Sequence, residues 1–301
     1  MKHSLKITLI LLLFFLLTQI LGLYLINSDI SINFDNNGKT VINHSDTVIG
    51  ARPDYNAQTS FISIIFAILI GTVLALLLIR FNLMFIWNIW FFIAVLISMA
   101  LALGVIMPSF LAFGISFILT LLKTFKLNIF THNLSEMLIY PGIALLFVPM
   151  LDLFWIFVLL IIISIYDMYA VWKSKHMIKL AEFQSKSHKF AGLMIPYHKI
   201  YHHKKISSKR KKEEKMAVLG GGDIFFPLLF SGVVMERLIV INGLSRLSSL
   251  FSTLIVTVFI TFSLFFLFYH GKKDRYYPAM PFLTAGCVAG YFVLKMFLFF
   301  M

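Results

Sequence analysis

The sequence predicts an all-α, polytopic membrane protein, on the basis of its composition and of the uncharged stretches along it. Of its 301 residues, 60% are apolar and only 13% are charged, which is too little polar surface for a soluble domain of this size. A helix needs about 20 apolar residues to cross a hydrocarbon core about 30 Å thick. Uncharged runs of about that length cover residues 7–28, 247–269 and 276–294, and the run 81–122 is long enough for two crossings.

We predict nine transmembrane helices in one membrane domain, residues 1–301. Their expected spans are residues 6–26, 61–79, 83–105, 108–122, 134–150, 153–172, 217–239, 247–269 and 278–299. The first span is interpreted as an uncleaved helix, because its apolar core is long for a signal peptide and no small-x-small site follows it. Residues 1–172 then hold six helices, residues 173–215 form a loop, and residues 216–301 hold the last three helices.

Two connections between the predicted helices are long. Residues 27–60 are polar, and Asn37-Gly38 between "ISINF" and "KTVIN" predicts a β-hairpin. Residues 173–215 carry 13 Lys or Arg, five His and three Glu. A basic cytoplasmic loop beside anionic headgroups explains this charge better than a nucleic-acid site does. The His202-His203 pair is interpreted as solvated, and "SSKRKKEEK" as mobile.

The positive-inside rule sets the expected orientation. With the N-terminus in the cytoplasm, 21 of the 26 Lys and Arg lie in inner segments. The exceptions are Lys39, Arg52, Arg237, Arg246 and Lys295. Nine spans then place the C-terminus outside the cell.

Two aspartates lie where a bilayer protein should avoid them. Glu136, Asp152 and Glu236 are near the ends of predicted spans, where headgroups can hold a carboxylate. Asp167 and Asp223 lie further inside, and an ionisable side chain at the centre of a membrane helix costs about 2.5–3.5 kcal/mol on insertion scales. Such residues usually have a function, although a single Asp near a helix end can also reach the headgroups or pair with a Lys.

The two aspartates are predicted at matching depths on antiparallel helices. Asp167 is six residues before Lys173 and Asp223 is eight residues after Lys215, which corresponds to about 9 Å and about 12 Å from the inner boundary. Two carboxylates that share a site hold about one proton near neutrality. The ionised one can accept a proton from water as the water attacks a carbonyl, while the other donates to the oxyanion.

Three glycines, Gly220 to Gly222, precede Asp223. They weaken the start of the predicted helix and allow another chain to approach closely, so exposed backbone there could pair with an extended substrate strand. Non-helical backbone at this depth requires a neighbouring protein segment or a hydrated cavity. Considered alone, a glycine triplet is also typical of close helix packing.

The chain resembles the presenilin and signal peptide peptidase family of intramembrane aspartyl proteases. Three segments carry the resemblance: "YD" at Tyr166-Asp167, Gly-x-Gly-Asp at Gly220 to Asp223, and "PAMP" at Pro278 to Pro281. The resemblance implies that Asp167 and Asp223 are the catalytic pair, supported by Tyr166, Gly220 and Gly222. It further implies that Gly221, Pro278, Ala279, Met280 and Pro281 contact substrate. Met280 stands where the family usually has Leu.

The expected activity is therefore hydrolysis of peptide bonds inside the transmembrane segments of other proteins, without a metal or another cofactor. The single cysteine, Cys287, allows no internal disulfide and no cysteine-based metal site. Expected partners are transmembrane protein or peptide substrates and membrane lipids, but no nucleic acid; an oligomer is compatible with the sequence. Within the family, signal peptide peptidases are inverted relative to presenilins, and a cytoplasmic loop between the two Asp spans resembles the presenilin orientation. The compact chain resembles a microbial, archaeal type of homologue, which implies a prokaryotic cell membrane.

Two other functions share features of this sequence. A transporter, or a cation or proton leak, could use the same pair of buried aspartates. A prepilin-type peptidase shares a Gly-x-Gly-Asp segment, but nine spans and the proline motif of the last one argue against it.

Overall fold

A computed structural model describes residues 4–35, 38–52, 56–125, 128–174, 190–196, 216–271 and 277–300. Most of these residues are helical. The helices are α1 (Leu5–Asp29), α2 (Ala57–Arg80), α3 (Met84–Gly104), α4 (Ser109–Phe125), α5 (Ile129–Phe147), α6 (Leu153–Met168), α8 (Gly221–Asn242), α9 (Arg246–His270) and α10 (Met280–Phe299). A short 3-10 turn, η1 (Val148–Met150), follows α5, and a π-helical turn, η2 (Tyr169–Lys173), follows α6.

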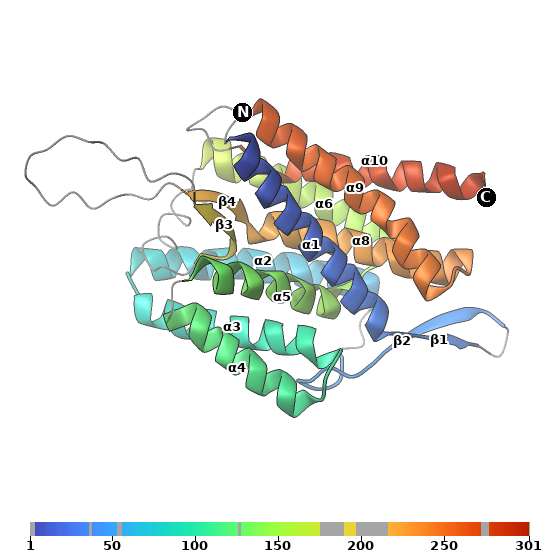
Figure 1. Ribbon diagram of the computed structural model, residues 1–301, viewed down its shortest axis with the longest axis horizontal. Helices are drawn as coiled ribbons and strands as arrows, with labels where there is room; N and C mark the ends of the chain where they lie inside the picture. Colours follow the sequence, from blue (N-terminus) through green and yellow to red (C-terminus); the bar gives the residue numbers. More distant parts are fainter. Residues whose placement is uncertain are drawn as a thin grey trace, which may run out of the picture.

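The helices form a bundle in which the ends of the chain lie at opposite ends (Figure 1). Eight helices of the described residues are long enough and apolar enough to cross a bilayer, and α4 is apolar but shorter. The protein is therefore a polytopic membrane protein, as predicted. Side chains such as Phe66, Phe110 and Phe262 are exposed on the bundle surface, as expected where lipid replaces water as the surrounding solvent.

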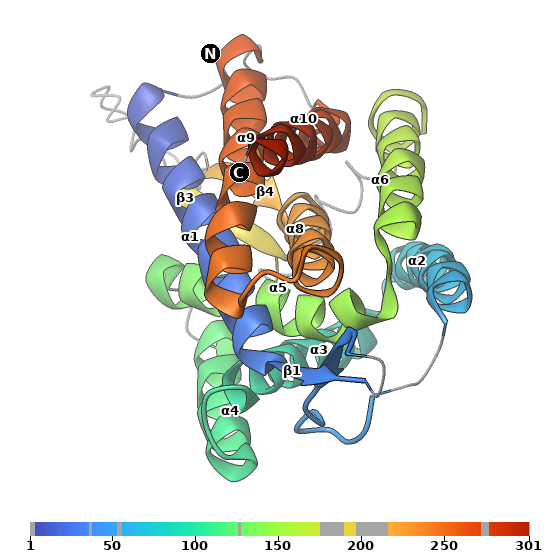
Figure 2. The same cartoon turned by 90° about the vertical axis from the view of Figure 1, so that its right-hand side faces the viewer.

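Helix α8 occupies the centre of the bundle. It contacts α1, α5, α6, α9 and α10, which surround it in the end-on view (Figure 2). Its side chains from Leu228 to Val234 are buried. The middle of α8 is thus held on several sides, while its first turn lies at the edge of the core.

Two pairs of antiparallel strands mark the two ends of the bundle (Figure 1). β1 (Ile30–Phe34) and β2 (Thr40–His44) form the predicted hairpin; Asn37 of its turn lies outside the described residues. β3 (Gly192–Pro196) and β4 (Met216–Gly220) pair at the other end. We call these the β1–β2 end and the β3–β4 end.

The β3–β4 pair corrects the prediction for this region. Residues 217–220 were expected to be helical, but they form β4, and the helix begins only at Gly221. β3 was missed inside the segment interpreted as a loop. At residues 217–220, backbone pairing with β3 takes the place of helical hydrogen bonds. Gly220 is the extended residue before the helix, which begins with Gly221 and Gly222. The "SSKRKKEEK" segment and His202-His203 lie outside the described residues.

Other boundaries differ by a few residues. α5 begins at Ile129, five residues before the expected start, because Asn128 caps it by accepting a hydrogen bond from the Phe130 amide. α10 begins at Met280, after Pro278 and Ala279. Gly286 and Gly290 of α10 lie against α9, where an added Cβ would come within 3.0 Å of Ile260 Cα and 2.8 Å of Val256 Cα. This close approach holds α10 firmly beside α9.

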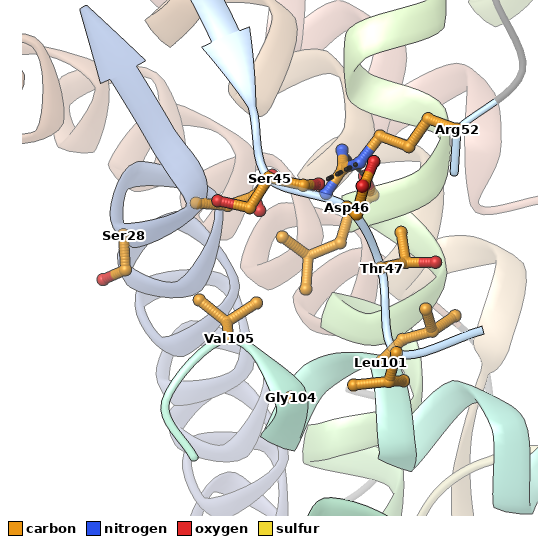
Figure 3. A pocket seen from close by; sticks show the side chains of 11 residues that line it. Ser28, Ser45, Asp46, Thr47, Arg52, Leu101, Gly104 and Val105 are labelled. Carbon is orange, nitrogen blue, oxygen red and sulfur yellow. Dashed lines mark hydrogen bonds and ion pairs between the residues drawn. The ribbon is translucent and has the colours of Figure 1, made fainter. Parts of the chain in front are cut away.

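A charged cluster joins the hairpin to the bundle at the β1–β2 end. His44 places Nδ1 2.9 Å from Asp29 and Nε2 3.2 Å from Glu236 of α8. Arg52 lies 2.6 Å from Asp29 and donates to the Leu145 carbonyl at the end of α5. Figure 3 shows Arg52 beside Ser45, at a cavity of about 100 Å³. Glu236 therefore binds the hairpin, where headgroup contact was expected.

The cluster predicts a pH-dependent stability. Burial lowers the pKa of the His44 imidazole, but hydrogen bonds and charge from Asp29 and Glu236 outweigh burial and raise that pKa from 6.5 to about 9. Because the folded-state pKa is the higher one, this contribution is complete below about pH 6.5 and is lost as the pH rises through about 9. We expect the apparent Tm in detergent to fall between about pH 6.5 and about pH 9. Over this range the free energy of unfolding should decrease by at most about 3 kcal/mol.

His44→Gln should flatten the fall in Tm between these pH values. His270→Gln is the matched control, because His270 is exposed at the end of α9 and should leave the pH profile unchanged. A His44→Gln profile that is parallel to that of the unmodified protein would contradict the assignment.

Candidate active site

Asp167 lies in the last turn of α6, and only 7% of its surface is exposed. The helix changes directly after it into the wider π-helical turn η2, in which the Ser174 amide donates to the Tyr169 carbonyl at 3.0 Å. π-helical turns are uncommon and often occur at functional sites. Asp167 is thus buried inside the bundle at the β3–β4 end.

The "PAMP" segment contacts Asp167 through its backbone. The Met280 amide donates to Asp167 Oδ2 at 3.1 Å. Met280 is the first residue of α10, where amides have no acceptor within the helix, and Pro281 behind it has no amide hydrogen to satisfy. The positive end of the α10 dipole therefore faces the Asp167 carboxylate and favours negative charge there.

Asp223 lies in the first turn of α8 and is half-buried. Its Oδ2 is 3.3 Å from the position that a Cβ on Gly220 would take, so the carboxylate lies over the glycine segment. An acidic side chain in a first turn is stabilised by the helix dipole. α6 and α8 contact each other and run in opposite directions, and Asp167 and Asp223 both lie at the β3–β4 end.

Strand β4 leads directly into the turn that carries Asp223. Gly192 is opposite Gly220 in the register of β3 with β4, and the Gly221 amide donates to the Ala191 carbonyl at 3.2 Å. In an antiparallel pair, the backbone groups of opposing residues alternate between facing the partner strand and facing away from it. Those of Gly192 face away from β4, so those of Gly220 face away from β3.

Side chains of α5 bond the far edge of β3. Asn133 donates to the Met194 carbonyl at 2.8 Å and accepts from the Met194 amide at 3.0 Å. His132 Nε2 is 2.8 Å from the Gly192 carbonyl, and the Gly192 amide donates to Glu136 Oε2 at 2.9 Å. These three side chains therefore take the place of a third strand.

Glu136 lies in the core, which corrects the expectation that headgroups hold it. Only 1% of its surface is exposed, and it forms an ion pair with Lys123 of α4. It also accepts a hydrogen bond from the Tyr140 hydroxyl. The sequence position indicated a span end, but it could not indicate that α4 and β3 cover this point.

Tyr140 explains why Gly221 has no side chain. A Cβ on Gly221 would come within 2.5 Å of the Tyr140 hydroxyl oxygen, 2.7 Å of Cε1 and 2.9 Å of Cζ. Tyr140 is buried, so its ring cannot easily move aside. The variable position of the Gly-x-Gly-Asp segment is thus closed by α5.

Comparison with known proteins shows the family of this chain. A family model described as "Signal-peptide peptidase, presenilin aspartyl protease" matches residues 12–300. The chain belongs to this family. It is accordingly an intramembrane aspartyl protease, which confirms the activity predicted from the three motifs. A search of curated proteins finds no significant match.

Two solved structures have the same fold. One is described as a presenilin family intramembrane aspartate protease in space group C222, with a TM-score of 0.60 and 20% identity over 96% of this chain and 99% of that chain. The other is described as a presenilin family intramembrane aspartate protease in space group P2, with a TM-score of 0.57 and 21% identity over 95% of this chain and 96% of that chain.

The remaining expected site residues of this presenilin-family protein are near the same end. Tyr166 donates to the Thr72 hydroxyl of α2 at 3.3 Å, and Gly222 is exposed in the first turn of α8. Pro278 and Ala279 are buried. Within the described ranges, no three His, Cys, Asp or Glu side chains gather as metal ligands would. The sequence did not predict Tyr140, His132 or Asn133 at the site. The only signal in the sequence is that Glu136 and Tyr140 are four residues apart, and therefore on one face of the same helix.

The contact with Tyr140 predicts a stability difference between neighbouring glycines. Gly221→Ala should destabilise the protein by about 1–3 kcal/mol, because the added methyl group overpacks against Tyr140. Thermal unfolding in detergent measures this change.

Gly222→Ala is the matched control. Its Cβ would meet Phe226 at 3.7 Å, an ordinary contact, and alanine favours the helix by up to about 1 kcal/mol. In a Tyr140→Leu background, the Gly221→Ala penalty should shrink. Equal effects of the two alanines in the unmodified background would refute the steric explanation.

Proposed function

We propose that Asp167 and Asp223 are the catalytic pair of this intramembrane protease and that they activate one water molecule between them. The observation that carries this proposal is the hydrogen bond from the Met280 amide to Asp167 Oδ2, because it joins two motifs that are more than a hundred residues apart. The Gly-x-Gly-Asp motif carries Asp223, which lies in the first turn of the adjacent helix α8, at the same end of the bundle as Asp167.

The surroundings of the two carboxylates suit acid and base catalysis. Each lies at the amino-terminal end of a helix, Asp167 at that of α10 and Asp223 at that of α8. These dipoles stabilise one negative charge on the pair. The second carboxyl group keeps its proton, because two adjacent negative charges would repel each other.

The reaction follows from this arrangement. The ionised carboxylate accepts a proton from water as the water oxygen bonds to the peptide carbonyl carbon, and the protonated carboxyl group donates to the carbonyl oxygen. When the carbon–nitrogen bond breaks, the proton taken from water passes to the leaving amine, and a hydroxyl group of the tetrahedral intermediate returns a proton to the carboxylate that had donated one. The products are a carboxylic acid and an amine, and the aspartates return to their starting state with one proton between them.

The open edge of β4 is the proposed place for the substrate backbone. The backbone groups of Gly220 face away from β3, beside Asp223. A transmembrane helix protects its peptide bonds from water, so the substrate must unwind before cleavage. An extended substrate segment could recover its lost hydrogen bonds along this edge, with Pro278, Ala279 and Met280 near the scissile bond.

We further propose nine crossings with the β3–β4 end in the cytoplasm. The positive-inside pattern supports this orientation, and the position of the two chain ends at opposite ends of the bundle supports an odd number of crossings. With its 17 residues, α4 then forms the shortest crossing, since α6 continues through η2 to Lys173 as one span. The prokaryotic cell membrane, contacts with lipids and any oligomer remain predictions.

Substitution of either aspartate should abolish cleavage. Asp167→Asn and Asp223→Asn keep the shape of the side chain but remove its acid and base chemistry, so cleavage of a single-span reporter in liposomes should fall roughly 10³-fold or more. Cleaved reporter is measured by gel and mass spectrometry.

Asp152→Asn is the control. Asp152 caps α6 at the opposite end of the bundle by accepting a hydrogen bond from the Trp155 amide, and asparagine caps equally well. This variant should cleave at the normal rate. Full activity in either the Asp167 or the Asp223 variant would disprove the catalytic assignment.

A further inference from the structure

The Lys123–Glu136 ion pair has no part in the proposed chemistry, although it is among the most deeply buried charges of the described residues. The Lys123 and Glu136 side chains are 2% and 1% exposed. Lys123 lies in the last turn of α4 and its ammonium is also 3.2 Å from His132 Nδ1. Burying two charges is costly, and an ion pair offsets this cost only if the remaining polar atoms are well bonded.

The Glu136 carboxylate divides its bonds between two directions. Oε1 faces Lys123. Oε2 accepts from the Tyr140 hydroxyl and, at 2.9 Å, from the Gly192 amide. The ion pair therefore orients Glu136 so that its second oxygen holds one residue of α5 and one residue of β3.

Both bonds lead to the segment that carries Asp223. Gly192 is opposite Gly220 in the β3–β4 register. Tyr140 lies against Gly221. Through Gly192 and Tyr140, the two bonds of Oε2 thus act on two adjacent glycines, Gly220 and Gly221, which are three and two residues before Asp223.

We propose that the Lys123–Glu136 pair is a positioning site, which sets the place of Asp223 through Tyr140 and Gly192. This inference rests on the proposed function of Asp223. The pair touches neither substrate nor the reacting atoms. It holds the Gly220–Gly221 backbone on the side of α5 and β3. This limits how far the first turn of α8 can shift in the catalytic step.

The kinetic test uses Glu136→Ala, which removes both bonds of Oε2. Its kcat, normalised to active sites titrated with an aspartyl-protease transition-state analogue, should fall roughly 10- to 100-fold, since a displacement of about 1 Å has effects of this size. KM should change by less than about threefold, because the loss falls on the chemical step.

A conservative double variant separates positioning from charge. In Glu136→Gln, the amide oxygen can replace Oε2 and accept from Tyr140 and Gly192, but the amide NH₂ then faces the Lys123 ammonium. Lys123→Met removes that conflict. The Lys123→Met, Glu136→Gln double variant should therefore recover most of the kcat that Glu136→Gln loses, although it contains one more substitution.

Hydrogen exchange provides a readout that does not depend on activity. Amides of residues 192–195 and 216–221 should exchange faster in Glu136→Ala and at the normal rate in the double variant. Glu236→Gln is the matched control, because Glu236 is also a carboxylate paired with a base, His44, but at the opposite end. It should alter neither kcat nor exchange in these two segments.

An unchanged kcat per active site in Glu136→Ala would overturn the proposal and leave the pair a purely structural role. Normal exchange at residues 192–195 in that variant would also overturn it. Failure of the proposed function has a different signature, since Asp167→Asn or Asp223→Asn would then retain activity while the exchange result still reports on the Glu136 contacts.

Discussion

The need to bond every backbone group inside a bilayer-spanning protein shapes the β3–β4 end of this molecule. A two-stranded sheet leaves one edge of each strand open, and an open edge in hydrocarbon is strongly unfavourable. Here Asn133, His132 and Glu136 of α5 bond the edge of β3. The opposite edge, on β4, belongs to the same segment as the Gly-x-Gly-Asp motif. One edge is thus closed by the protein itself, and the other adjoins the proposed catalytic aspartates.

Helix ends provide the second organising feature. α8 and α10 both begin at the β3–β4 end, and their first turns carry or contact the two aspartates. The protein therefore stabilises negative charge with backbone amides, where a soluble enzyme could use water or mobile side chains. Close packing of Gly286 and Gly290 against α9 keeps α10 in place, so packing far along the helix supports the position of the Met280 amide.

Much of this could be predicted from the sequence, because the bilayer imposes a simple rule on length and polarity. The uncharged runs identified the helices, the Asn37-Gly38 pair identified the hairpin, and three motifs identified the family. β3 was missed because five residues between charged segments carry no membrane signal, and β4 because "MAVLG" continues an apolar run. The role of Glu136 depends on partners from α4 and β3, which no local pattern reveals.

The burial of Cys287 has a practical consequence for spectroscopy. This only thiol of the chain lies fully enclosed in α10, out of reach of water-borne maleimide or spin-label reagents while the protein is folded. A cysteine introduced on the exposed hairpin or beside β4 would therefore be labelled selectively in the native background. Pairs of such labels could follow movements between the strands and the helices without replacing Cys287, whose removal would leave a void in the core.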